Sequence, residues 1–268
     1  MPNKLLTIAT INLNNAGGLR KTINSLLPLR GDPDIDFVFQ DGDSKDESLT
    51  VAKDFYRGDE LLSQRDAGIY NAMNRSLHRA RGEYIIWINS GDQFIPEQLE
   101  IVKNSILYHK PDMAIFATSI IEENGGSEPM HANFNNISKG IPHPSTVFAT
   151  KKIKDVGCYD ESFKIAGDLD LILRISRKKA KILISKEIIS NFYLGGTSSS
   201  SNFWPETWRA FSKNKILPNW KRHLNILKYA LILNIPIASK LRLKKLSVVS
   251  KEKVITLHDL GATIIHQN

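Results

Sequence analysis

The first half of the chain alternates between short continuous apolar runs and longer segments with apolar residues at helical spacing. The short runs are typical of buried strands, and the spaced segments are typical of helices with one buried face. They predict strands at Leu5–Ile11, Ile35–Gln40, Tyr84–Ile88 and Met113–Ala117, and helices at Gly18–Leu27, Lys45–Phe55, Tyr70–Ala80 and Ile95–Tyr108. This alternation predicts an α/β fold, in which a mostly parallel sheet is flanked by helices.

Polar side chains stand where three of these strands end. They are Thr10, Asn12, Asp41 and Asp92. Ligands bind beyond the carboxyl ends of parallel strands, so we expect these side chains to meet in one crevice. Amides and carboxylates placed there suit the ring edge and ribose hydroxyls of a nucleotide, and Gly42 lets its backbone come close. The next two residues, Asp43 and Ser44, could bind the same ligand or only cap the following helix.

A polar turn then leads directly into the third predicted helix. A helix N-terminus beside Arg65 suits an anionic ligand, with Asp66, Gly68 and Asn71 as candidates to hold it. Asp66 could instead be only an N-cap, and Asn71 a buried amide with structural partners.

The apolar strand that ends at Ile88 runs into Asn89-Ser90-Gly91-Asp92. A Mg²⁺ or Mn²⁺ ion that bridges a diphosphate keeps several waters and needs only one or two protein carboxylates. Asp92 is therefore the candidate metal ligand, and Asn89 is a candidate to contact the ligand that carries the diphosphate. A simple turn aspartate is the alternative.

Downstream, Asp168 and Asp170 lie at the start of a segment with an apolar face. A carboxylate can take the proton of an attacking hydroxyl, and one such base is enough for displacement with inversion. Asp170 is expected to be structural, because it can pair with Arg174 one helical turn later. His143, held between two prolines, is either a cleft residue or a structural histidine.

The net charge of +8 is concentrated near the C-terminus. Residues 213–253 hold eleven lysines and arginines against the single acid Glu252. We therefore expect a nearly neutral globular domain at residues 1–212 and a separate basic segment after it. Residues 213–268 are expected to form a basic, amphipathic and helical extension that meets an anionic membrane surface.

The single cysteine, Cys158, excludes an internal disulfide framework and fits a reducing compartment. The longest apolar run, Tyr229–Ala238, is too short to cross a bilayer, and the N-terminus does not have the pattern of a signal peptide. We expect a cytoplasmic protein that associates with the inner face of the cell membrane.

Four motifs in order make the resemblance to a known family specific. The Asp66–Asn74 string, the step at residues 80–84, the Asn89–Asp92 turn and the segment around Asp168 resemble family 2 glycosyltransferases of the GT-A fold. The likeness covers roughly residues 4 to 200. It is strongest to bacterial enzymes of exopolysaccharide, O-antigen and colanic-acid type. Two departures stand out: Asn89-Ser90-Gly91 precedes Asp92 where many relatives have Asp-x-Asp, and Gly167 stands where a Glu often precedes the base.

The resemblance implies a catalytic domain at residues 1–212, with nucleotide-sugar binding in 1–95 and the acceptor and base region in 96–212. It also implies a role for each candidate residue. Asp168 matches the catalytic base, and Asp92 matches the ligand of a divalent metal, Mn²⁺ or Mg²⁺. The end of the first strand, Asp41 and Asp66 would hold a nucleotide-diphosphate sugar, UDP in preference to GDP. Contacts to the acceptor or diphosphate would come from His143, Gly196 and Thr197. The acceptor would be a saccharide, carried on a polyprenyl diphosphate.

Two rival functions use some of the same features. A sugar-nucleotide pyrophosphorylase shares an α/β nucleotide domain but would need a basic Gly-rich loop directly after the first strand. A non-enzymatic nucleic-acid-binding protein could use the basic C-terminal segment, but the acidic crevice would then have no purpose. We therefore expect no nucleic acid partner.

Overall fold

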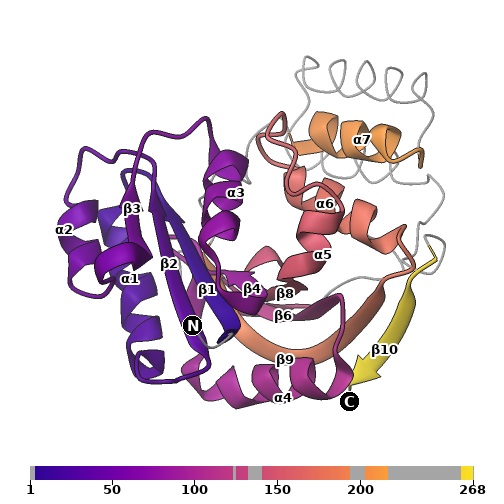
Figure 1. Ribbon diagram of the computed structural model, residues 1–268, viewed down its shortest axis with the longest axis horizontal. Helices are drawn as coiled ribbons and strands as arrows, with labels where there is room; N and C mark the ends of the chain where they lie inside the picture. Colours follow the sequence, from indigo (N-terminus) through magenta and orange to yellow (C-terminus); the bar gives the residue numbers. More distant parts are fainter. Residues whose placement is uncertain (1–3, 123–124, 132–140, 194–202, 217–260, 268) are drawn as a thin grey trace.

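The computed structural model describes residues 4–122, 125–131, 141–193, 203–216 and 261–267 (Figure 1). The helices are α1 (Ala16–Leu26), α2 (Ser48–Lys53), α3 (Ile69–Arg79), α4 (Leu99–His109), α5 (Thr150–Asp155), α6 (Gly167–Ser176) and α7 (Phe203–Lys213). The strands are β1 (Lys4–Asn12), β2 (Ile35–Asp41), β3 (Leu61–Ser63), β4 (Gly82–Trp87), β5 (Gln93–Phe94), β6 (Met113–Ile121), β7 (Ser127–Met130), β8 (Thr146–Ala149), β9 (Lys181–Tyr193) and β10 (Thr263–Gln267). The predicted α/β class is confirmed.

One curled sheet runs through the molecule in the order β10-β9-β6-β8-β4-β1-β2-β3 (Figure 1). Its N-terminal part is parallel as expected, since β1 pairs parallel with both β2 and β4. β8 differs, because it lies antiparallel between β4 and β6. The sheet is therefore mixed at its centre. Asn12 of β1 lies opposite Asp41 of β2, so the predicted strand ends do meet.

Helices cover both faces of the sheet and build two apolar cores. Alternate residues of β1 show the division: Leu6 and Ile8 point to the core under α1, α2 and α4, while Ala9 and Ile11 point to the core under α3, α5, α6 and α7. This period of two is what a strand buried on both sides requires. The residues that follow the strands are thereby held on a rigid scaffold.

Several elements differ from the sequence-based expectation. The second helix begins at Ser48 rather than Lys45, because the Asp46 carboxylate instead accepts the backbone N–H groups of Ser48 and Ala16. Neither Asp43 nor Ser44 caps this helix. Strands β3, β5, β7, β8, β9 and β10 were not predicted from the sequence, and β10 joins the sheet beside β9.

The C-terminal part of the chain bears on the predicted domain boundary at residue 212. Helix α7 continues across this boundary to Lys213, and β10 belongs to the main sheet. Residues 217–260, which carry most of the basic extension, lie outside the described residues. Among the residues that the structure does describe, no helix is both long and apolar enough to cross a membrane.

Candidate active site

The ends of β1, β2 and β3 are joined by a polar cluster around Asp41. This carboxylate accepts hydrogen bonds from Asn12 Nδ2 (2.9 Å), the Ser44 backbone N–H (2.8 Å), Ser44 Oγ (2.5 Å) and Ser63 Oγ (2.7 Å). Burial acts to raise the pKa of Asp41, but the hydrogen bonds from Ser44, Asn12 and Ser63 outweigh it and the pKa lies below its ordinary value. Asp41 is thus an ionised group that holds three strand ends together.

Asp66 closes the same cluster from the turn before α3. Its Oδ1 accepts the N–H of Gly68 at 2.9 Å, and its Oδ2 packs against Gly42. A Cβ atom at Gly42 would lie only 2.6 Å from that oxygen, so the glycine is required for this approach. Gly68 has a φ of +126°, which favours glycine. The structure therefore brings Asn12 and Asp41 together as predicted and adds Asp66 to them, whereas Asp92 lines a cavity that these three do not line.

Two other donor-site candidates have structural partners instead. Thr10 is fully buried, and its hydroxyl donates to the Ile88 carbonyl at 2.8 Å. Asn71 accepts the N–H of Ala67 and donates to Glu161 at 2.8 Å. These contacts connect neighbouring elements. Both side chains already have hydrogen-bond partners within the protein.

The turn after β4 places Asp92, and its shape is fixed from α1. The Thr22 hydroxyl donates to the Asp92 carbonyl at 2.7 Å and accepts the Gly91 N–H at 3.0 Å. Asn15 Nδ2 donates to the Ser90 carbonyl at 3.0 Å. Gly91 has a φ of +111°, a conformation that other residues rarely adopt. The turn is therefore rigid before any ligand arrives.

The Asp92 side chain is only 8% exposed, and burial raises its pKa to about 7. No ion pair to it exists among the described residues, and the nearby Asn89 Oδ1 is buried there without a hydrogen-bond partner. A buried carboxylate without an ion pair and an unpartnered amide oxygen suit a divalent cation, which would stabilise the ionised form of the carboxylate. Within the described ranges, no group of three or more His, Cys, Asp and Glu side chains could hold a metal by itself. A cation here would thus depend on phosphate oxygens from a ligand.

Asp168 lies in the first turn of α6 and is half-buried. Its Oδ1 accepts the N–H of Leu169 at 2.8 Å. Burial raises the pKa of Asp168 to about 6, and the Glu206 charge acts in the same direction. The Tyr70 ring occupies the space beside Gly167, since a Cβ there would meet ring atoms at 2.6 Å. This packing explains why a glycine precedes the carboxylate.

One small cavity of about 90 Å³ joins candidates from three distant segments. It is lined by Ile69, Tyr70, Met73, Asn89, Asp92, His143, Pro144, Lys164, Ile165, Asp168 and Phe192. His143 begins a short 3-10 turn, and burial lowers its pKa to about 4, so the imidazole is neutral at pH 7. Its Nε2 has no hydrogen-bond partner among the described residues. Two carboxyl groups that hold protons more tightly than usual therefore share a pocket with a neutral imidazole.

The three other predicted residues are Gly196, Thr197 and Asp170. Gly196 and Thr197 lie outside the described residues. Asp170 is fully buried and its Oδ2 pairs with Arg174 Nε at 2.8 Å, which confirms the predicted ion pair.

Three residues that support the site were not identified from the sequence. Thr22 interrupts the apolar stripe of α1 between Leu19 and Ile23, and a buried polar residue on such a stripe is a usable signal. Tyr70 and Glu206 gave no signal, because each contacts the segment before Asp168 from far away in the sequence.

Comparisons with known proteins identify the family of this chain. A family model described as Glycosyl transferase family 2 matches residues 7–167, more than half of the chain. An uncharacterized glycosyltransferase of Mycobacterium tuberculosis is 25% identical over 177 residues, covering 63% of this chain and 68% of the relative. A PGL/p-HBAD biosynthesis glycosyltransferase of Mycobacterium bovis is 24% identical over 178 residues, covering 62% and 69%.

Solved structures share the fold at low identity. TarS 1-349 of S. aureus in complex with UDP-GlcNAc has a TM-score of 0.65 and 17% identity, covering 89% of this chain and 69% of that one. The mannosyltransferase PcManGT of Pyrobaculum calidifontis, in complex with GDP-Man and Mn²⁺, has a TM-score of 0.61 and 11% identity, covering 95% and 77%. The family match favours neither the pyrophosphorylase nor the nucleic-acid-binding alternative. The chain belongs to glycosyl transferase family 2 and is a glycosyltransferase with the GT-A fold.

Proposed function

We propose that this enzyme transfers a sugar, with inversion, from a nucleotide-diphosphate sugar to a hydroxyl group of a saccharide acceptor. The observation that carries the proposal is the shared pocket of Asp92 and Asp168, with His143 and Asn89 beside them. A site for such a reaction needs a group that receives a proton on one side and a place for a departing diphosphate on the other. Two carboxyl groups in different surroundings meet both needs.

The donor is proposed to lie across the ends of β1, β2 and β4. The cluster of Asn12, Asp41 and Asp66 is placed for the nucleoside, and the Asn89–Asp92 turn for the diphosphate. Since the protein itself occupies the Asp41 carboxylate with four hydrogen bonds, we assign it mainly to shaping this end of the site. The TarS and PcManGT structures hold UDP-GlcNAc and GDP-Man, respectively, which supports a nucleotide-sugar donor here. We propose UDP as the nucleotide.

We propose that Asp92 holds a divalent cation together with the donor diphosphate. A bound cation would neutralise the negative charge that develops on the departing group. The Mn²⁺ in the PcManGT structure supports a metal in this fold. Asn89 offers a second oxygen, and the neutral imidazole of His143 offers a hydrogen bond to the diphosphate or the acceptor.

Asp168 is proposed to be the general base. An acceptor hydroxyl gives its proton to the Asp168 carboxylate while its oxygen forms a bond to the anomeric carbon. The bond from that carbon to the diphosphate oxygen breaks, and the nucleoside diphosphate leaves with the electron pair. A base with a pKa near 6 is ionised at pH 7 and still accepts a proton readily.

We further propose a lipid-linked acceptor of bacterial surface polysaccharide synthesis, met at the cytoplasmic face of the membrane. The support is the charge of residues 213–253, where basic residues such as Arg242, Lys244 and Lys245 alternate with leucines. Each basic side chain near an anionic membrane contributes about 1 kcal/mol. Most of this segment lies outside the described residues. Co-sedimentation with anionic but not neutral liposomes, weakened by replacing these three residues with Gln, tests this part separately.

The central test is direct. Thermal shifts with UDP and GDP, with and without Mn²⁺, identify the nucleotide, because a ligand that binds only the native state raises its melting temperature. Matching nucleotide sugars are then offered with saccharide acceptors, and NMR gives the anomeric configuration of the product. Transfer with retained configuration, or no shift with any nucleoside diphosphate, would contradict the proposal.

A further inference from the structure

The backbone just before Asp168 is held by a carboxylate from α7. The Glu206 side chain accepts the N–H groups of three successive residues: Lys164 at 3.0 Å, Ile165 at 2.7 Å and Ala166 at 3.0 Å. Convergent backbone N–H groups of this kind form an anion-binding concavity. Here the anion is supplied by the protein itself, from 40 residues away in the sequence.

These three residues lead straight into the proposed base. Ala166 is the N-cap residue of α6, and Asp168 follows within the first turn. Ala166 has no side chain that could cap the helix, and no side-chain cap occurs there. The position of Asp168 therefore depends on how firmly the preceding backbone is held.

Helix α3 also contacts this backbone. The Tyr70 hydroxyl donates to the Ile165 carbonyl at 2.5 Å, and the Tyr70 ring packs against Gly167. The peptide groups around Ile165 are thus fixed at their N–H by Glu206 and at their carbonyl by Tyr70. In Figure 1, α3 lies to the left of α6 and α7 lies above it.

We propose that Glu206 is a positioning residue for Asp168, which it holds in place through the backbone of Lys164–Ala166. This inference rests on the proposed role of Asp168 as the general base. Misplacing a reacting group by about 1 Å can cost about a hundredfold in rate, so a small slip of the α6 start is enough to matter. Binding of the donor diphosphate at Asp92 does not need this contact.

The test compares substitutions that separate charge, length and location. Glu206→Gln keeps one acceptor oxygen but places an amide NH₂ against the N–H groups, whereas Glu206→Asp keeps the carboxylate. Arg209→Gln is the matched variant on α7, because Arg209 Nη1 donates to the Ser162 carbonyl at 3.0 Å, farther along the chain from Asp168. Glu83→Gln is a second control, because it removes an exposed acid near the start of β4, at the end of the strand away from the Asp92 turn.

We expect Glu206→Gln to lower kcat roughly ten- to hundredfold with little change in the donor KM. Glu206→Asp should recover part of the loss, and Arg209→Gln and Glu83→Gln should keep kcat within about threefold. Amide hydrogen exchange at residues 164–166 should accelerate most in Glu206→Gln, less in Glu206→Asp, and not in Arg209→Gln or Glu83→Gln. A normal kcat in Glu206→Gln with faster exchange there would overturn the proposal, as would an equal loss in Arg209→Gln.

Failure of the positioning role of Glu206 can be distinguished from failure of the proposed function. If Asp168→Asn transfers sugar as fast as the wild type, the base assignment fails whatever Glu206 does. If Asp168→Asn is inactive and Glu206→Gln is fully active, only the positioning role fails. A melting temperature for each variant identifies substitutions that act by unfolding, and Glu206→Asp supplies the folded comparison in that case.

Discussion

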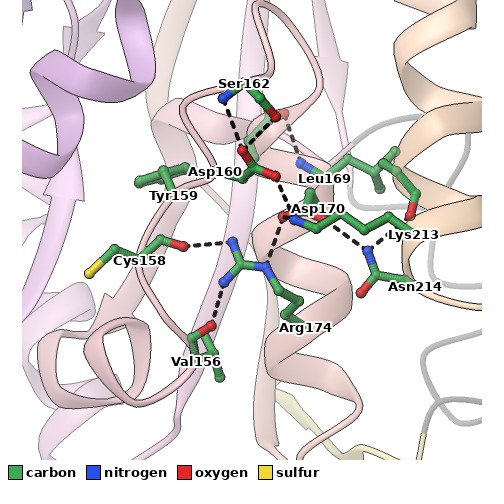
Figure 2. A network of polar contacts seen from close by, with 12 residues as sticks. Val156, Cys158, Tyr159, Asp160, Ser162, Leu169, Asp170, Arg174, Lys213 and Asn214 are labelled. Atoms are coloured by element: carbon green, nitrogen blue, oxygen red, sulfur yellow. Dashed lines mark hydrogen bonds and ion pairs between the residues drawn. The ribbon is translucent and has the colours of Figure 1, made fainter.

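Asp168 and Asp170 lie two residues apart on α6, yet their surroundings differ completely. Asp170 is fully buried and saturated: it accepts from Arg174 Nε, from Lys213 Nζ at 3.0 Å and from Asn214 Nδ2 at 2.9 Å (Figure 2). Arg174 in turn donates to the Val156 and Cys158 carbonyls. Asp168 faces the small cavity and, among the described residues, has no ion pair.

The contrast shows how one helix serves both structure and chemistry. A buried carboxylate with paired cations and complete hydrogen bonding is an anchor, and it can do no proton transfer without losing those bonds. A carboxylate held in a cavity without a cation keeps its capacity to accept a proton, and burial tunes its pKa toward neutrality. The helical period of 3.6 residues places the two on different faces.

The largest expected effect is on catalysis at Asp168. Asp168→Asn should lower transfer by about a hundredfold or more, in line with general-base contributions. Because the change removes a carboxyl group that is costly to ionise there, the melting temperature at about pH 8 should not fall. Steady-state kinetics and thermal unfolding check both parts. Near-normal turnover would remove Asp168 from the role.

Replacing Asp92 should increase the stability of the protein and remove a proposed metal ligand. Its raised pKa means that the native state binds this proton more tightly than the unfolded chain, so the stability it contributes is lost as pH rises from about 4 through about 7. Asp92→Asn should therefore raise the free energy of unfolding at about pH 8 by roughly 2 to 4 kcal/mol. The gain should shrink toward about pH 4.

The same pair of proteins tests the metal without an activity assay. Mn²⁺ with UDP should raise the melting temperature of the wild type at about pH 8 far more than that of Asp92→Asn. Equal shifts in both proteins, or transfer by the wild type that is unchanged in EDTA, would detach Asp92 from metal binding.

Asp170 should behave as the anchor that its contacts describe. Asp170→Asn should destabilise the protein by about 2 to 3 kcal/mol, less than a fully enclosed pair would lose, because Lys213 is partly exposed. The folded fraction should keep its kcat within a few fold. Urea unfolding and single-turnover kinetics measure these two quantities. A selective loss of kcat without loss of stability would place Asp170 in the reaction instead.

Local patterns in the sequence predicted part of the difference between Asp168 and Asp170. Periodicity located α1 to α4 and the strands β1, β2, β4 and β6, and the spacing of four residues predicted the Asp170–Arg174 pair. The contacts of Thr22 with the Asp92 turn and of Glu206 with Ile165 join residues about 70 and 40 positions apart. No local period encodes such partners, and β10 likewise depends on a strand far upstream. Tertiary packing alone determines how firmly the two carboxylates of the pocket are held.

The smallest effect concerns the pH profile of the wild type, and it separates Asp168 from His143. With a pKa of about 6, Asp168 is protonated below that pH, so kcat at saturating donor and Mn²⁺ should fall about tenfold per pH unit below about 6. An ordinary aspartate would keep the rate constant down to about pH 4. His143, with a pKa of about 4, should add no change near its ordinary value of 6.5. The residual activity of Asp168→Asn should lack the fall near pH 6. A wild-type profile that stays flat to about pH 4 would contradict the tuned base.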